Sequence, residues 1–174
     1  MKNSFVQVLT LACVSWVAAL DAKAQPCILD WDVSIGNPGF DGEVLSLAVH
    51  DDGTGPALYA GGRFTTAGGE LAARVAKWNG TSWSPLGDGI RGAQDLFDAE
   101  VRAMQSFDDG NGPGLFVAGD FTRAGDVADA RGIAVWRDGV WSAVGPGVAD
   151  SSRGEVVRSM VVFDDGTGSA LFVG

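Results

Sequence analysis

Short apolar runs alternate with turn-forming residues along most of the chain. From Val44 onward, apolar runs at 44–50, 57–63, 73–78 and 82–87 are separated by segments rich in Gly, Asp, Asn and Pro. Runs of this length with such boundaries are typical of β-strands, and the short connections favour antiparallel pairing. The pattern therefore predicts a four-stranded antiparallel meander and an all-β fold.

Two kinds of tight turn connect the predicted strands. Asp-Asp-Gly-Thr-Gly at 51–55 separates the first two strands, and Asn79-Gly80 separates the last two. These residue types tolerate positive φ angles and are typical of hairpins. At the end of the second strand stands Gly61-Gly62, where we expect another backbone to approach too closely for a side chain.

The whole meander recurs along the chain. Leu58 of the second strand returns as Leu115, 57 residues later, and the Asp-Asp-Gly turn returns at 108 and 164. One such sheet cannot bury both of its faces, so repeats of this kind stack against their neighbours. The predicted units are an N-terminal segment at 25–43, repeats at 44–100 and 101–156, and a truncated third repeat at 157–174.

Each complete repeat carries two Trp residues five positions apart, Trp78 with Trp83 and Trp136 with Trp141. Because they recur at the same place in both units, we expect them to fill the space between neighbouring sheets. Stacking on a carbohydrate is the alternative role for these rings.

The run from Leu58 to Gly62, followed by Trp78 and Trp83, resembles kelch-like, galactose-oxidase-type β-propeller repeats. It is also similar to the Trp-rich repeats of large secreted bacterial proteins. The resemblance implies a β-propeller fragment of four-stranded antiparallel blades, although the unit exceeds the roughly 50 residues usual for kelch. A propeller often closes its ring with an N-terminal strand, and 31–36 is the candidate. Since two and a half repeats leave unpaired strand edges, we expect further blades of the same chain to complete the ring.

The first 24 residues have the layout of a secretory signal. Lys2 precedes an apolar stretch from Phe5 to Leu20, and the small-residue pattern of 22–24 follows it. We predict cleavage after Ala24 and a secreted or extracellular protein, or one in the periplasm or at the cell surface, with no membrane insertion after cleavage. The alternatives are a membrane anchor and a lipoprotein modified at Cys13.

Net charge and cysteine content limit which binding partners and which disulfides we expect. Cleavage at that point leaves 10 basic and 21 acidic residues, a formal charge of −11, which disfavours nucleic acid. Only Cys27 of the two cysteines remains in the processed chain. It therefore stays free or pairs with a thiol elsewhere.

The sequence contains candidate metal ligands and catalytic acids, but their spacing does not define a site. Kelch-like propellers include a copper oxidase, but His50 and Tyr59 are the only residues of their types, and one imidazole cannot supply a copper ligand set. The Asp-Asp-Gly turns lack the spacing of an EF-hand, and calcium stays an alternative for them. A glycosidase pair could come from four acids, whose separation the sequence does not define: Glu43, Glu70, Glu100 and Glu155.

We therefore predict no catalytic, cofactor-binding or metal-binding residues and no cofactor. The leading hypothesis is a non-enzymatic extracellular binding or structural module on a β-propeller scaffold, with a protein or glycan ligand. Recognition would fall to the loops at 36–43, 64–72, 88–100 and 122–130. The alternative is the N-terminal part of a secreted propeller enzyme, a hydrolase or lyase, with catalytic residues beyond Gly174.

Overall fold

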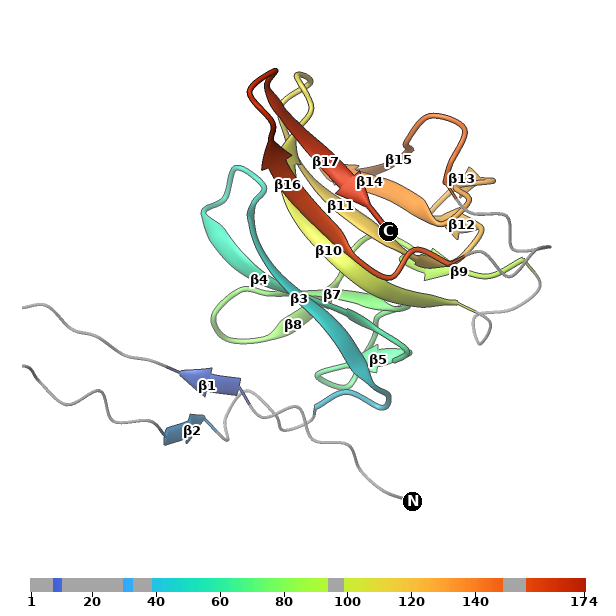
Figure 1. The fold of residues 1–174 in the computed structure, drawn as a ribbon. Coiled ribbons are helices and arrows are strands. Elements are labelled where there is room, and N and C mark those ends of the chain that lie inside the picture. Colours follow the sequence, from blue (N-terminus) through green and yellow to red (C-terminus); the bar gives the residue numbers. More distant parts are fainter. Residues whose placement is uncertain (1–7, 11–29, 33–38, 94–98, 149–155) are drawn as a thin grey trace, which may run out of the picture.

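The computed structural model describes residues 8–10, 30–32, 39–93, 99–148 and 156–174. Within these ranges every regular element is a β-strand, the strand pairs are antiparallel, and no sheet closes on itself (Figure 1). The predicted all-β class is confirmed. Since the described ranges contain no helix, none of them supplies a helical membrane span.

Three sheets follow one another along the chain. The first consists of β3 (Val44–Asp51), β4 (Pro56–Gly62), β7 (Val75–Trp78) and β8 (Trp83–Pro85), paired in that order. The second repeats this order with β10 (Glu100–Asp108), β11 (Pro113–Asp120), β14 (Ile133–Arg137) and β15 (Val140–Ala143). The third is the hairpin of β16 (Met160–Asp164) and β17 (Ser169–Val173). Both four-stranded meanders lie where the sequence predicts them.

Three of the four stretches expected to be recognition loops, 64–72, 88–100 and 122–130, contain short strands. Between the second and third strands of the first sheet lie β5 (Thr66–Ala67) and β6 (Glu70–Leu71), and at the equivalent place in the second sheet lie β12 (Arg123–Ala124) and β13 (Val127–Ala128). β9 (Ile90–Arg91) of the first repeat pairs with β12. Main-chain hydrogen bonds therefore join the two repeats outside the main sheets.

Near the N-terminus, β1 (Val8–Thr10) pairs with β2 (Asp30–Asp32). β1 belongs to the predicted signal segment, and β2 overlaps the start of the predicted ring-closing strand. The remainder of both segments, together with Cys13 and Cys27, lies outside the described residues.

A backbone irregularity recurs at the start of both complete sheets. The strand register shifts between Val44 and Ser46, and again at the equivalent place in β10. A Cβ added to Gly62 would lie 1.9 Å from the carbonyl oxygen of Glu43, and one added to Gly119 would lie 2.1 Å from that of Glu100. The predicted close backbone approach is confirmed at Gly62, and it explains why the second repeat keeps a glycine at 119.

Successive sheets pack face to face through equivalent residues. Tyr59 and Val75 of the first sheet form one buried cluster with Val101 and Met104 of the second. A second cluster joins the next two sheets through Ile133, Val157 and Met160, which are the counterparts of Val75, Val101 and Met104, together with Ala118. The first strands β3, β10 and β16 lie side by side along this stack (Figure 1).

Local segments cover the fourth strand of the first sheet on the side turned away from the second sheet. Trp83 contacts the ring of Phe40 edge-on at a centroid distance of 4.8 Å, and Phe64 packs in the same cluster. Trp141, its counterpart, lies between the first and second sheets, where its Nε1 donates to the Leu86 carbonyl oxygen at 3.0 Å. The expected packing role of the Trp rings between sheets therefore holds for Trp141.

Candidate functional site

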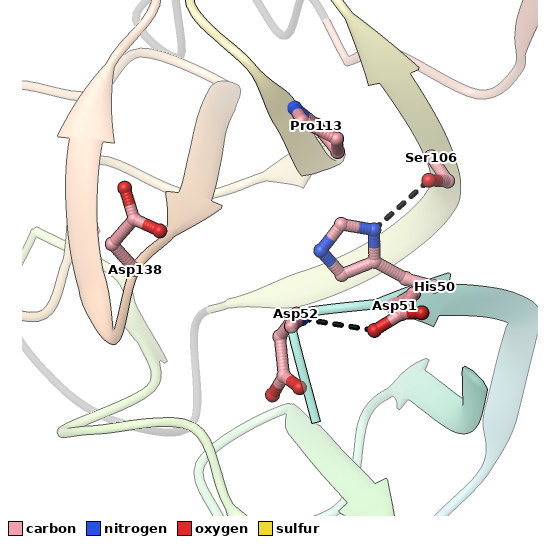
Figure 2. A pocket seen from close by; sticks show the side chains of 7 residues that line it. His50, Asp51, Asp52, Ser106, Pro113 and Asp138 are labelled. Carbon is pink, nitrogen blue, oxygen red and sulfur yellow. Dashed lines mark hydrogen bonds between the residues drawn. The ribbon is translucent and has the colours of Figure 1, made fainter. Parts of the chain in front are cut away.

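A cavity of about 410 Å³ opens between the first two sheets, at the end where the Asp-Asp-Gly turn lies. The end of β3, the turn that follows it, β10 and the β14–β15 turn contribute its walls (Figure 2). The lining residues are His50, Asp51, Asp52, Gly53, Ser106, Pro113 and Asp138. Three carboxylates, one imidazole and one hydroxyl therefore border the same space.

His50 is the buried polar group of this cavity, with 2% of its surface exposed. Its Nδ1 lies 2.9 Å from the Ser106 hydroxyl oxygen, a hydrogen bond between the first and second sheets (Figure 2). Burial lowers the pKa of His50 below its ordinary value, against the opposing influence of Asp52 and Asp51. A neutral imidazole is consequently favoured at pH 7.

The pair departs from the repeat. The positions equivalent to His50 in the next two units are Phe107 and Phe163, and those equivalent to Ser106 are Val49 and Val162. The first interface thus holds a polar pair at positions where the second and third sheets hold Phe107 and Val162. Sequence reasoning missed Ser106, although its departure from Val at the aligned positions was a usable signal.

The turn carboxylates are engaged in holding the turn. Asp51 accepts hydrogen bonds from the backbone N–H groups of Gly53 and Gly55, both at 2.9 Å. Asp108 and Asp164 accept the equivalent pairs in the second and third turns. An Asp side chain favours a turn because it accepts a hydrogen bond from the backbone N–H two residues further along the chain. In the described ranges no group of three or more His, Cys, Asp or Glu residues is arranged to hold a metal ion.

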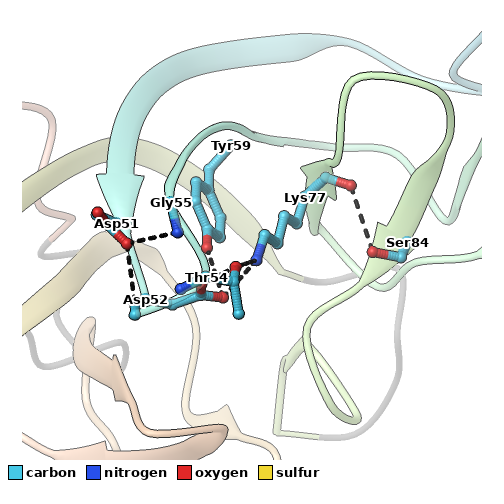
Figure 3. A network of polar contacts seen from close by, with 8 residues as sticks. Asp51, Asp52, Thr54, Gly55, Tyr59, Lys77 and Ser84 are labelled. Atoms are coloured by element: carbon cyan, nitrogen blue, oxygen red, sulfur yellow. Dashed lines mark hydrogen bonds and ion pairs between the residues drawn. The ribbon is translucent and has the colours of Figure 1, made fainter.

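Asp52 is the centre of a polar network beside the cavity (Figure 3). Lys77 donates to its carboxylate at 2.5 Å, and the Tyr59 hydroxyl donates at 3.1 Å. Burial raises the pKa of Asp52, but the hydrogen bonds from Lys77, Thr54 and Tyr59 outweigh it and hold that pKa well below its ordinary value. Burial, followed by the nearby Asp52 charge, raises the pKa of Tyr59. The network therefore keeps Asp52 ionised and Tyr59 protonated at neutral pH.

The second repeat anchors the equivalent carboxylate differently. Arg137 donates to Asp109 at 2.8 Å and also to the Gly112 carbonyl oxygen at 3.1 Å. Lys77 and Arg137 stand on equivalent strands but not at aligned positions, because Val135 aligns with Lys77. Repeat comparison alone therefore does not find these anchors.

The structure brings His50 and Tyr59 together, with ring centroids 5.7 Å apart. It does not give them the arrangement of metal ligands, because the His50 Nδ1 bonds Ser106 and the Tyr59 hydroxyl bonds Asp52. The same aromatic pairing recurs in the other units as Phe107 with Phe116 and Phe163 with Phe172. Packing accounts for the His50–Tyr59 contact.

Two of the four candidate glycosidase acids meet at one cation. Arg63 donates to Glu100 and to Glu43, its second contact being 3.2 Å, and Arg102 also pairs with Glu100. Glu100 is 7% exposed, so the ion pairs compensate a buried charge between sheets. Glu70 lies exposed on β6, and Glu155 is outside the described residues. This arrangement ties sheets together and places a cation between the two carboxylates.

A second cavity, of about 330 Å³, borders Trp136 and Trp141. Asp88 and Asp126 also line it. Trp141 is committed to packing between sheets, whereas Trp136 is half-buried and presents part of its ring to this space. Carbohydrate stacking stays an alternative for the exposed parts of the half-buried Trp136 and Trp78.

Comparison with known proteins finds no matching family model, no matching curated relative and no matching solved structure.

Proposed function

We propose that the chain is a non-enzymatic extracellular binding or structural module built on a β-propeller scaffold. The observation that carries this proposal is the recurrence of one interface. Val101 and Met104 pack against the first sheet, and their counterparts Val157 and Met160 pack against the second. A chain that repeats its core contacts in this way is an extensible scaffold, since each unit is stabilised by its neighbours.

The arrangement of the first strands supports a propeller. In a propeller, four-stranded sheets stand radially around a central channel. Here β3, β10 and β16 pack on one another, while the fourth strands β8 and β15 lie away from this line (Figure 1). The resemblance to kelch-like repeats agrees with this geometry. Blades completing the ring and a secreted location are parts of the same proposal.

The use of the polar groups supports a role without catalysis. The turns hold the carboxylates of Asp51, Asp108 and Asp164 through backbone hydrogen bonds, and Glu100 forms ion pairs with two arginines. Such groups stabilise a scaffold and leave its rims to bind a protein or glycan.

One observation favours a second candidate, a hydrolase. His50 and Ser106 form a hydrogen bond on the wall of a cavity, which is the contact a hydroxyl nucleophile needs with its base. In the part of the chain that the structure describes, no carboxylate hydrogen-bonds the His50 imidazole, so the third element of a catalytic triad is missing there. The scaffold is therefore the better-supported function.

The deciding experiment compares the native chain with the double variant His50→Phe, Ser106→Val, which restores the residues found in the other repeats. Hydrolysis of ester and glycoside substrates is measured together with binding to arrays of glycans and extracellular proteins. We expect no turnover by either protein and the same binding by both. Turnover by the native chain that the double variant lacks would establish the hydrolase instead.

A further inference from the structure

The cavity of about 330 Å³ beside Trp136 lies between the two complete repeats. The turn before β9 belongs to the first repeat and contributes Gly87 and Asp88. The turn between β12 and β13, together with β14 and β15, belongs to the second repeat and forms the opposite wall (Figure 1). The Gly125 N–H donates to the Gly89 carbonyl oxygen at 2.7 Å, so a main-chain hydrogen bond joins the two turns. Both walls therefore come from complete repeats.

Packing holds the ring of Trp136 in place at this cavity. Its centroid lies 5.1 Å from that of Trp141, with the two planes tilted by 58°. A Cβ added to Gly87 would lie 3.2 Å from Cζ3 and 3.3 Å from Cη2 of Trp136, so the six-membered ring lies close to this glycine. The Trp141 Nε1 donates to the Leu86 carbonyl oxygen, whereas in the described ranges the Trp136 Nε1 has no hydrogen-bond partner and reaches solvent. Trp136 thus supplies a positioned ring and an available donor.

The two carboxylates of this cavity do not recur in the repeat. The turns 68–69 and 125–126 are equivalent, and Gly69 stands at the position of Asp126. The turns 86–89 and 144–147 close with the same main-chain hydrogen bond, and Pro146 stands at the position of Asp88. Since repetition indicates a role in the scaffold, these two acids are candidates for binding.

Neither carboxylate is used within the scaffold. Asp88 and Asp126 are exposed, and in the part of the chain that the structure describes neither accepts a hydrogen bond nor forms an ion pair. The turn acid Asp51, in contrast, accepts hydrogen bonds from two backbone N–H groups of its own turn. The cavity therefore holds two negative charges that no described cation compensates.

These groups favour a ligand that is cationic and also carries oxygen acceptors. Carboxylates form their strongest hydrogen bonds with charged donors, and the face of a Trp ring attracts a cation. A simple ammonium group has three donors and no acceptor, so it would leave the Trp136 Nε1 unpaired. A hexosamine with a free amino group supplies an ammonium, hydroxyl oxygens and an apolar C–H face. The cavity volume of about 330 Å³ is within the range of small-molecule sites.

We propose that this cavity binds a glycan through a hexosamine unit whose amino group is free. The sugar ring stacks on Trp136, and its ammonium and hydroxyl groups donate to Asp88 and Asp126. The same two charges repel acidic sugars. The inference rests on the proposed binding module and names the ligand class of one of its sites.

The test measures binding of defined oligosaccharides to the native chain by isothermal titration calorimetry, at a pH at which the amino groups are protonated. The probe is the tetrasaccharide of chitosan, and its matched control is the tetrasaccharide of chitin, in which each amino group is acetylated and uncharged. Tetralysine tests a simple amine. We expect the chitosan tetrasaccharide to bind at least about tenfold more tightly than the chitin tetrasaccharide, because hydrogen bonds between charged groups are the stronger ones. It should also bind more tightly than tetralysine.

Variants locate the binding at the cavity. Asp88→Asn and Asp126→Asn each remove one charge with little change of shape, and Trp136→Leu removes the ring. We expect each to weaken binding of the chitosan tetrasaccharide by about tenfold. Glu70→Gln is the matched control for the acids, because Glu70 is exposed on β6 and borders neither cavity. Trp78→Leu is the control for the ring, because Trp78 is its half-buried counterpart in the first repeat.

Several outcomes would overturn the inference. They are an absence of binding of the chitosan tetrasaccharide to the native chain, equal binding of the chitin tetrasaccharide, and equal or tighter binding of tetralysine. Equal weakening by Glu70→Gln would show that binding follows net charge, which also overturns it. If far-UV circular dichroism shows that Trp136→Leu is unfolded, the two Asp variants decide.

The proposed function fails by a different result. Mass spectrometry of the tetrasaccharide after the titration shows whether it is intact. Cleavage would overturn the proposed non-enzymatic role while leaving the cavity as the binding site. Loss of the cavity's role with an intact tetrasaccharide would overturn this inference alone.

Discussion

The Nδ1 atom of His50 lies 2.9 Å from the hydroxyl oxygen of Ser106, across the boundary between the first two sheets. The aligned positions in the next two sheets hold the apolar residues Phe107 and Val162. The first interface is therefore the one whose stability depends on a titratable group of the cavity.

This dependence predicts that acid weakens the first interface. The pKa of His50 in the folded chain lies below its ordinary value of 6.5, because burial disfavours the imidazolium. The unfolded chain therefore binds the proton more readily, and the free energy of unfolding decreases as the pH falls through 6.5 toward the folded-state pKa. Urea denaturation at a series of pH values, followed by Trp fluorescence, measures this slope.

The double variant His50→Phe, Ser106→Val supplies the control for this slope. We expect its free energy of unfolding at pH 7 to stay within about 1.5 kcal/mol of the native value, because Phe and Val are the residues found at the aligned positions of the other repeats and similar-sized apolar replacements are well tolerated. Between about pH 5 and 6.5 its stability should change less than that of the native chain. Equal slopes in the two proteins would show that another group titrates.

Replacing Lys77, the cation that pairs with Asp52 in the polar network, is predicted to lower the free energy of unfolding. Substitution Lys77→Met keeps the length of the stem but leaves the Asp52 carboxylate, whose side chain is 17% exposed, without its ammonium partner. We expect a loss of about 1–3 kcal/mol in the free energy of unfolding at pH 7, since removing one partner leaves a largely buried charge. The loss should shrink in Asp52→Asn, Lys77→Met, and a double-mutant cycle by urea denaturation measures the coupling. A coupling near zero would contradict the network.

The same network predicts a second decrease in the free energy of unfolding, at lower pH than the decrease caused by His50. Hydrogen bonds hold the pKa of Asp52 well below its ordinary value of 3.8 despite the opposing effect of burial. Its contribution to stability is therefore complete above pH 3.8 and is lost as the pH falls below that value. Asp52→Asn should flatten this lower limb while leaving the slope that begins at pH 6.5 in place, and unfolding curves below pH 4 measure the difference.

Much of the fold follows from sequence because its determinants are local. Turn residues such as Asp51 and Gly53 act within five positions, and the strands between them differ from the predicted ranges by a few residues at most. The two-residue strands β5, β6, β12 and β13 are too short for a periodic signal, so they were predicted as loops.

The candidate site follows from sequence much less well because its contacts join separate repeats. Ser106 reaches His50 from 56 positions away, and Arg63 reaches Glu100 from 37. Alignment of the repeats identifies His50 as a substitute for Phe, but only the packing of one sheet on the next shows what opposes it. Lys77 and Arg137 serve equivalent carboxylates from unaligned positions, which no repeat pattern encodes.

The two glycines at the end of the second strand are predicted to tolerate alanine differently. A Cβ at one of them would meet backbone atoms, and a Cβ at the other would meet side-chain atoms. A Cβ on Gly62 would lie 1.9 Å from the Glu43 carbonyl oxygen, and the backbone must move to admit it. A Cβ on Gly61 would lie 2.5 Å from Val101 Cγ1 and 3.1 Å from Met104 Sδ, atoms of side chains that can rotate. The second repeat has Ala118 at the position of Gly61 and retains Gly119 at that of Gly62.

We therefore expect Gly62→Ala to lose at least about 3 kcal/mol of stability or to prevent folding, and Gly61→Ala to lose about 1–3 kcal/mol. Thermal unfolding of the two variants measures the order, and a more severe effect at Gly61 would mean that the carbonyl of Glu43 moves more easily than the side chains of the neighbouring sheet.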